Sequence, residues 1–537
     1  MSRILRCQMK KVRGHQGCRT VDLYPRQRIC SVCGQSLQER YRQLRYVVTL
    51  NGMLALKKHV LECQTSQCEQ FGRKWRSEAE GALVLPRYTF GLDVVARIGE
   101  LRYRQQQTIE QIATALAEQG VRISLKEIQL LSEAFLALIE TVIKNDPQVV
   151  EQLRAQGGIV LAADGIQPEK GNETLWLFRD VRSGRVLLAR NLLSSSRDEL
   201  APLIAEIKQL GVPILGVISD KQASLCLAIE KELPDVPHQL CQFHYLRDAA
   251  QPVCEADRKL KKQLKQKVRG LREIERQVAH KQDDEAVITR GYCAALREVL
   301  RHDGKYPLEP AGITLYDKLN KVDQSLERVT KKRASAKLQR LRTILQVLSS
   351  LTKDYARLVI AWSWIHRLAQ LLEENATRIE AEAGLLKYAN SLPQGKDTML
   401  NEIAIHIDKL TRAFAPKLFT FHDQPLLPKT NNDLETFIGE LKKSRRKVTG
   451  RKDTCSFILR EGRAVALLLS LPNKPVWVDN FATVDFADFQ TSLAALRCAE
   501  QRSRAWKIRR DLHLYLTRLE QDWEPSSSPS PSPATIE

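Results

Sequence analysis

Four apolar segments between residues 157 and 220 decide the fold: GGIVLAADG (157–165), ETLWLFRDV (173–181), GRVLLARNLL (184–193) and PILGVISD (213–220). Short apolar runs bounded by glycine, proline or charged residues predict buried β-strands. Ser183-Gly184 supplies a turn, and amphipathic helices are expected at 198–210 and 221–232. The segment HQLCQFH (238–244) completes the series. Three strands, a helix, a strand, a helix and a last strand predict a mixed α/β sheet.

Two aspartates end strands in this stretch. Asp164 closes the first apolar run and Asp220 closes the fourth. The strand order suggests that the two strands lie side by side, which would place two carboxylates at one sheet edge, where a divalent cation can bind. The alternative roles are a turn-capping aspartate for Asp164 and an N-cap of the following helix for Asp220.

The composition favours a polyanionic partner. The 537 residues suggest three or four domains, and 84 Lys and Arg against 63 Asp and Glu give a net charge of +21. The basic surplus is clustered, and nucleic acid is the first candidate. We expect a cytoplasmic protein, because no apolar run approaches the roughly 20 residues of a membrane helix and the N-terminus lacks the apolar core of a signal peptide.

Two cysteine pairs flank a predicted β-hairpin near the N-terminus. The segment RYVVTLNGMLALKKHVLEC alternates like two strands, with Asn51-Gly52 at the turn. A hairpin of this kind can bring four thiolates into the tetrahedron that structural Zn²⁺ prefers. The predicted zinc ligands are Cys30, Cys33, Cys63 and Cys68.

Alternatives remain open for this segment. His59 could replace one thiol, and reduced cysteines without metal are the simpler interpretation. Cys7 and Cys18 lack a convincing partner. Residues 1–80 carry 16 Lys and Arg against 6 Asp and Glu, so we interpret the segment as a DNA-binding zinc ribbon.

The next segment reads as a helix-turn-helix. After a helix at 90–103, Thr108 can cap a second helix, Gly120 makes a turn and Ser124 can cap a third. Two short helices around a glycine turn are typical of DNA-binding motifs, although many helical hairpins never touch DNA.

Helical periodicity dominates from residue 256 to residue 425. Residues 258–272 hold eight Lys and Arg and no acid, and long helical runs fill 315–390. Trp362 and Trp364 are the aromatic residues best suited to stack on an unpaired base, although most helical tryptophans are core residues. We therefore predict an all-helical insertion.

A last motif lies in LLPKTNNDLETFIGELKKSRRKVTGRK (426–452). Asn431 and Asn432 precede an amphipathic helix that carries Glu435, and Asp433 and Glu440 are rival acids on that helix. Seven basic residues and no acid follow between 442 and 452: Lys442, Lys443, Arg445, Arg446, Lys447, Arg451 and Lys452.

These features together resemble DDE-type transposases of bacterial insertion sequences, in the Mutator-like and hAT-like branch with a helical insertion. The likeness spans residues 157–452 and rests on strand-borne Asp164 and Asp220, Cys241-x-x-His244, the NNxxE motif with Glu435 and the basic run after it. Each motif is weak alone, and their order makes the combination specific.

The resemblance implies a ribonuclease-H-like core that holds two Mg²⁺ or Mn²⁺ ions. Asp164 would bridge the ions, and Asp220 and Glu435 would each complete one site. The basic run, and Trp364 in the insertion, would contact DNA. Cys241 and His244 would lie near the active site in an ordering or substrate-contact role, with a buried structural pair as the alternative.

The implied activity is transposition of double-stranded DNA, acting on transposon ends and target, by a nucleoid-associated homo-oligomer without membrane contact. A catalytically inactive DNA-binding regulator and a nuclease without strand transfer are the rival functions. The expected domains are a zinc ribbon (1–80), a helix-turn-helix region (81–150), the core in two parts (151–255 and 426–480), the helical insertion (256–425), a C-terminal helical segment (481–523) and a disordered tail (524–537).

Overall fold

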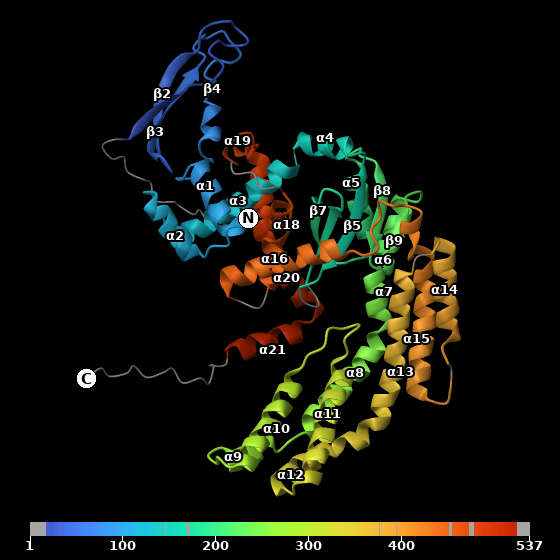
Figure 1. Ribbon diagram of the computed structural model, residues 1–537. Helices are drawn as coiled ribbons and strands as arrows, with labels where there is room; N and C mark the ends of the chain where they lie inside the picture. Colours follow the sequence, from blue (N-terminus) through green and yellow to red (C-terminus); the bar gives the residue numbers. More distant parts are fainter. Residues whose placement is uncertain are drawn as a thin grey trace, which may run out of the picture. The chain divides into compact units, whose positions relative to one another are not determined.

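The computed structural model describes residues 18–144, 146–168, 172–374, 376–393, 395–450, 454–471 and 477–523. The protein is mixed α/β, and both of its sheets combine parallel and antiparallel strands (Figure 1). It divides into two compact units, the first comprising Met1–Pro213, Leu227–Glu232 and Asp433–Glu537, and the second Ile214–Cys226 and Leu233–Asn432. Cys7, Arg451, Lys452 and the predicted tail at 524–537 lie outside the described residues.

The first sheet is built on a long hairpin, as the sequence predicts. Its two antiparallel strands meet at the pair Thr49 and Gly52, and the φ of Gly52 is +103°, a conformation that favours glycine. A short strand pairs in parallel with the second strand of the hairpin, and a two-residue strand pairs with the C-terminal end of that same strand. The strands are β1 (Arg19–Leu23), β2 (Gln38–Thr49), β3 (Gly52–Glu62) and β4 (Lys74–Trp75).

Three helical segments follow the sheet. Thr108 caps α2 through a full capping box with Gln111, and Gly120 at φ +80° makes the turn before α3. These contacts confirm the predicted helical hairpin. The segments are α1 (Leu92–Gly99), which continues into a π-helical turn (Glu100–Arg104), α2 (Ile109–Glu118) and α3 (Leu125–Lys144).

Helix α3 is mostly a core element. From Leu131 onward nearly every residue is buried, because α18 (Gly462–Leu469) and α20 (Phe486–Arg510) pack against it. Ion pairs join the same elements, with Arg463 on Glu140 at 2.8 Å. Exposed residues of α3 lie mainly in its first turns.

The first unit also contains an antiparallel three-stranded ladder. Its strands follow the order β7-β6-β5, and the turn before β7 uses Gly184 at φ +71°, as predicted. The ladder and its neighbours are α4 (Pro147–Ala155), β5 (Ile159–Ile166), β6 (Thr174–Asp180), β7 (Val186–Leu192) and α5 (Arg197–Lys208). Four further helices belong to this unit: α16 (Asn432–Thr449), α17 (Cys455–Arg460), α19 (Val478–Phe481) and α21 (Leu512–Trp523).

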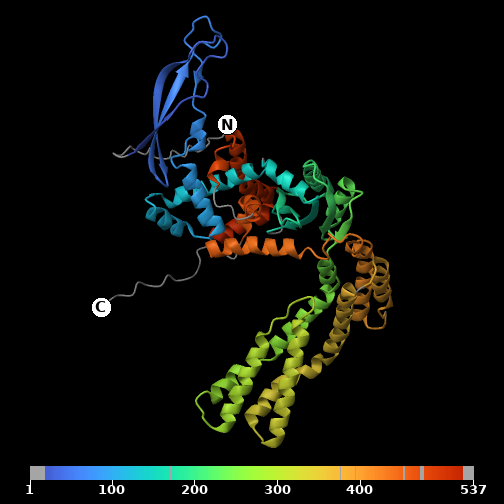
Figure 2. The ribbon, with the colours of Figure 1, turned by 45° about the horizontal axis from the view of Figure 1, so that its top comes forward.

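The second unit begins with the parallel pair β8 (Ile214–Ser219) and β9 (His238–Leu240), with α6 (Ala223–Glu232) between them in sequence. Long helices then pack side by side around one apolar core (Figures 1 and 2). They are α7 (Gln242–Ala249), α8 (Gln251–Lys267), α9 (Leu271–Val278), α10 (Asp284–Arg301), α11 (Ala311–Lys332), α12 (Ala336–Leu345), α13 (Val347–Glu373), α14 (Arg378–Ser391) and α15 (Thr398–Phe414).

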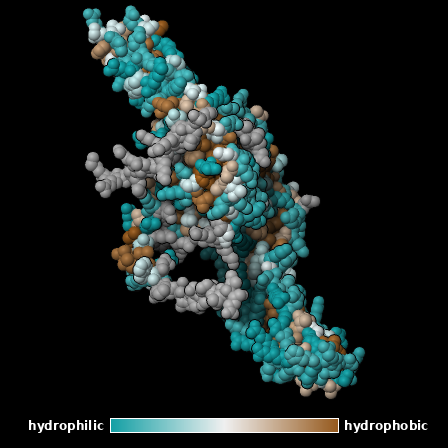
Figure 3. All heavy atoms as spheres, turned by 90° about the vertical axis from the view of Figure 1, so that its left-hand side faces the viewer, coloured by the Kyte–Doolittle hydropathy of each residue, from teal (hydrophilic) through white to brown (hydrophobic). Residues whose placement is uncertain are grey.

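The surface agrees with the charged composition. The face shown in Figure 3 is mostly hydrophilic, with hydrophobic residues interspersed among the polar ones. Among the described residues, no helix has the length and apolar character needed to cross a membrane.

Candidate metal centre and candidate catalytic residues

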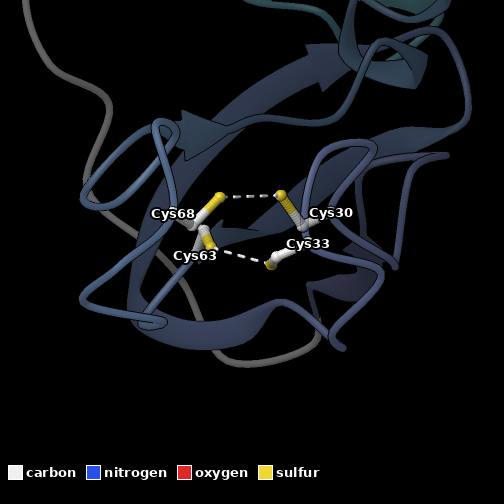
Figure 4. A group of neighbouring side chains, drawn as sticks. All are labelled: Cys30, Cys33, Cys63 and Cys68. Atoms are coloured by element: carbon white, nitrogen blue, oxygen red, sulfur yellow. Dashed lines mark hydrogen bonds between the residues drawn. The ribbon is translucent and has the colours of Figure 1, made fainter.

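Four cysteines of the first unit form a compact cluster (Figure 4). The Sγ atoms of Cys30 and Cys68 are 3.8 Å apart, those of Cys33 and Cys63 are 3.7 Å apart, and all four lie within 4.8 Å of one another. Zn–S bonds of about 2.3 Å in a tetrahedron require S–S separations of about 3.8 Å. The cluster therefore fits a metal ion such as Zn²⁺, and the predicted ligand set is brought together.

The local backbone explains why these residues converge. In ICSVCG the chain turns tightly, with the Gly34 N–H donating to the Cys30 carbonyl at 3.0 Å and Gly34 at φ +69°. The second pair is held by a turn in which the Gly72 N–H donates to the Cys63 carbonyl at 2.9 Å. The hairpin β2–β3 carries both turns to the same end of the sheet.

The thiols of the cluster titrate unequally. A hydrogen bond from the Gln35 backbone N–H and the hydrogen bond between Cys33 and the Thr65 hydroxyl lower the pKa of Cys33 to about 6. The Gln70 N–H acts in the same direction on Cys68, but burial and the neighbouring sulfurs outweigh it and raise the pKa of Cys68 to about 12. Four thiolates at this spacing repel one another, and a bound cation relieves that repulsion.

His59 is engaged elsewhere in the same sheet. Its Nδ1 lies 2.6 Å from Glu39 and its Nε2 2.8 Å from Asp22, and the ring stacks on Tyr24. The cysteine cluster is complete without it, so the alternative in which His59 replaces a thiol is not adopted.

Asp164 lies inside β5 rather than at its end. It is half-buried, its Oδ1 accepts the Gly165 N–H at 2.7 Å, and the strand continues to Ile166. Asp164 pairs across the ladder with Leu177 of β6. Because cross-strand partners and residues two apart share a sheet face, Asp164 lies on the same face as Arg179.

Arg179 links that face to α16. Its guanidinium forms an ion pair with Asp433 and lies 5.0 Å from the centre of the Phe437 ring. The first turn of α16, which contains Glu435, is therefore held over the face that carries Asp164. Sequence reasoning missed Arg179, and the one basic residue within the apolar run ETLWLFRDV was the available signal.

The acids of α16 differ in their surroundings. Asp433 forms the ion pair with Arg179, and the side chain of Glu440 is exposed. Glu435 is half-buried. This difference supports Glu435 over its two rivals.

Asp220 immediately follows β8 in the second unit and is half-buried. Its Oδ1 accepts the Gln222 N–H at 3.1 Å, one residue before α6 begins. That bond is the local turn interaction expected of an aspartate before a helix. The bond uses one carboxylate oxygen of Asp220, and the role of Asp220 as a metal ligand stays a prediction.

The Cys-x-x-His segment meets the asparagine motif within the second unit. The Asn431 N–H donates to Cys241 Sγ at 3.2 Å, and the Gln242 N–H donates to the Lys429 carbonyl at 3.0 Å. Cys241 and His244 are both buried. This geometry fits both an ordering role and a buried structural pair, so the role of Cys241 and His244 near an active site stays a prediction.

The remaining predicted DNA contacts fall into two groups. On α16, Lys443, Arg446 and Lys447 are exposed, whereas Lys442 and Arg445 are half-buried. In α13, Trp364 is only 7% exposed and belongs to the helical core, so the core alternative describes its position. Trp362 is half-buried and packs edge-on against His366.

No protein-family model matches the sequence, and no curated protein matches it either.

Proposed function

We propose that this protein is a DNA transposase that binds the inverted repeats at transposon ends, cleaves them and joins the 3′-hydroxyls to target DNA. One observation carries the proposal: Arg179 holds the first turn of α16 over the sheet face that bears Asp164. Two carboxylate-bearing segments more than 250 residues apart thereby converge.

The strand sequence also supports the proposal. An antiparallel ladder, β5 to β7, precedes the parallel pair β8 and β9 along the chain. A ribonuclease-H-like core uses three antiparallel strands followed by parallel ones, and we propose that these five strands form such a core. The all-helical segment of the second unit would then be its insertion.

The residues would act in the following way. Asp164, Asp220 and Glu435 offer the hard oxygen ligands that Mg²⁺ prefers, and two such ions can activate the attacking oxygen and stabilise the leaving one. Arg179 positions Glu435 indirectly, through its ion pair with Asp433 in the same helical turn. Cys241 orders the residues that precede α16, through the hydrogen bond that it accepts from Asn431. Lys443, Arg446 and Lys447 would contact the DNA backbone, which fixes position without reading sequence. The cysteine cluster would hold Zn²⁺ in the end-binding module.

The test is cleavage of duplex DNA that carries the inverted repeats flanking the gene, in Mg²⁺. Asp220→Asn is expected to bind this DNA but lose cleavage, whereas the control Asp235→Asn, an exposed acid of the same unit, should cleave normally. Equal cleavage by Asp220→Asn and wild type would contradict the assignment of the metal ligands.

A second assay separates the rival functions. With pre-cut ends and a target plasmid, a transposase should join strands, and a nuclease should not. A DNA-binding regulator should neither cut nor join DNA, whichever divalent metal ion is added.

A further inference from the structure

A polar cavity of about 530 Å³ lies within the first unit. It is lined by the π-helical turn at 100–104, the first turn of α2, Gln129 of α3, the end of α16, and α17. Its volume falls within the range of about 300–1,000 Å³ typical of ligand sites. π-Helical turns are rare and often occur at functional sites.

The charged side chains of the cavity have an excess of positive charge. The basic residues are Arg102, Arg445, Lys447 and Arg460, and the acidic ones are Glu110 and Glu461. Arg460 is paired with Glu133 at 2.7 Å. Glu461 lies 3.9 Å from Arg445 and accepts the Tyr103 hydroxyl at 3.3 Å. These pairs leave two cations, Arg102 and Lys447, and one acid, Glu110, whose carboxylate interacts electrostatically with Arg102, so the cavity keeps an excess of one positive charge.

Arg102 is the decisive residue. It is only 6% exposed, and its Nε and Nη1 find no hydrogen-bond partner among the residues that the structure describes. The guanidinium also contacts Tyr103, but two buried nitrogens without a hydrogen-bond partner are costly, since they have left water without full compensation. Its planar fork matches the two oxygens of a phosphate or carboxylate.

The remaining walls are a helix N-terminus and a lysine. The first turn of α2 lines the cavity with Thr108, Ile109 and Glu110, and the partial positive charge of the helix N-terminus there already stabilises the carboxylate of Glu110. Lys447, exposed at the rim, continues the basic face of α16 into the cavity. A DNA strand that lies on this basic face could therefore place one of its phosphates beside Arg102.

We propose that this cavity is a phosphodiester-binding subsite, in which Arg102 holds one phosphate of the DNA backbone in a bidentate manner. The site would fix DNA against the helical hairpin α2–α3 and the end of α16 together. The choice of DNA as the source of the phosphate rests on the proposed function, whereas the anion site itself does not.

The experiment uses the full chain and two probes, inorganic phosphate and duplex DNA. Phosphate should raise the melting temperature of the wild type in a saturable way and should not do so in Arg102→Gln. In DNA binding, Arg102→Gln should reduce the slope of log Kobs against log salt by about 0.9, the value for one lost phosphate contact. Arg197→Gln, which removes an exposed arginine outside the cavity, should leave both measurements unchanged.

Each other outcome counts against the proposal. A phosphate shift that Arg102→Gln abolishes while the salt slope stays the same would overturn DNA as the ligand and indicate a small phosphate compound. If phosphate raises the melting temperature of Arg102→Gln and of the wild type equally, the proposal of an anion site at Arg102 is wrong. If Arg102→Gln fails to fold, Lys447→Gln at the rim must weaken the phosphate-induced rise in melting temperature in its place. If Arg102→Gln changes the salt slope but the wild type never cleaves DNA, the phosphate subsite stands and the proposed transposase function is wrong.

Discussion

The backbone N–H of Asn431 donates to the Sγ of Cys241 at 3.2 Å, across 190 residues of sequence. Both residues are buried, and the bond lies one residue before α16 begins. A thiol is a weak acceptor, so its value here is positional: it fixes the point at which the chain returns from the helical segment. The same chain end then delivers Glu435 four residues later.

Replacement of Cys241 by alanine should therefore weaken both stability and cleavage. Loss of the acceptor leaves a buried N–H unsatisfied, at a cost of about 1–3 kcal/mol in the free energy of unfolding. Cleavage should fall while DNA affinity and zinc content stay the same. Cys293→Ala, which removes an equally buried thiol from the same unit, is the matched control. Loss of zinc from Cys241→Ala would show instead that Cys241 is a metal ligand.

Removal of the Arg179–Asp433 ion pair should slow DNA cleavage without abolishing DNA binding. Arg179→Gln and Asp433→Asn should each reduce the cleavage rate by about tenfold to a hundredfold, since a displacement of about 1 Å at a reacting group can have that effect. Glu435→Gln should abolish cleavage, and Glu440→Gln on the exposed side of the helix should not change it. If Glu440→Gln is the inactive variant, the assignment of Glu435 is wrong.

Local signals in the sequence predicted much of the fold. The Asn51-Gly52 hairpin and the Thr108 cap are both present, because each depends on a few neighbouring residues. The cysteine cluster was predictable for the same reason, since a hairpin of known length joins its two halves. Helix ends were less exact, and the helix expected at 198–210 spans Arg197–Lys208.

Contacts between distant segments could not be predicted. Nothing in the sequence near Arg179 indicates that it pairs with Asp433, because the return path of the chain decides that contact. Helical periodicity also cannot tell which of Trp362 and Trp364 faces the core, and Trp364 proves to be the buried one. The burial of α3 depends on α18 and α20, more than 300 residues away.

The helical segment should lose stability in acid through Glu275. Hydrogen bonds from Arg297 hold the pKa of Glu275 below its ordinary value of 4.5. A carboxyl whose pKa is lowered by folding stabilises the protein above its unfolded pKa, and that contribution disappears as the pH falls through 4.5 and below. Hydrogen exchange of residues 271–301 should therefore accelerate in acid, after correction for the intrinsic rate.

The variant Arg297→Gln isolates this effect. It should raise exchange in α9 and α10 at pH 7 and flatten the dependence on pH, because Glu275 then titrates near its ordinary value. Arg301→Gln removes a highly exposed arginine of the same helix and should behave like wild type. An Arg297→Gln profile parallel to that of wild type would show that the pair contributes no pH-dependent stability.

The cysteine cluster should bind one zinc ion per chain and stabilise the first sheet. Zinc ligation and folding are coupled in small modules of this kind, so Cys63→Ala should abolish zinc binding and expose β2 and β3 to hydrogen exchange. The exposed Cys498 is the matched control, and Cys498→Ala should retain zinc. End-DNA affinity, measured without Mg²⁺ so that a chelator acts only on zinc, should fall when the metal is removed. A metal-free protein with the same affinity would show that the cluster has no part in DNA binding.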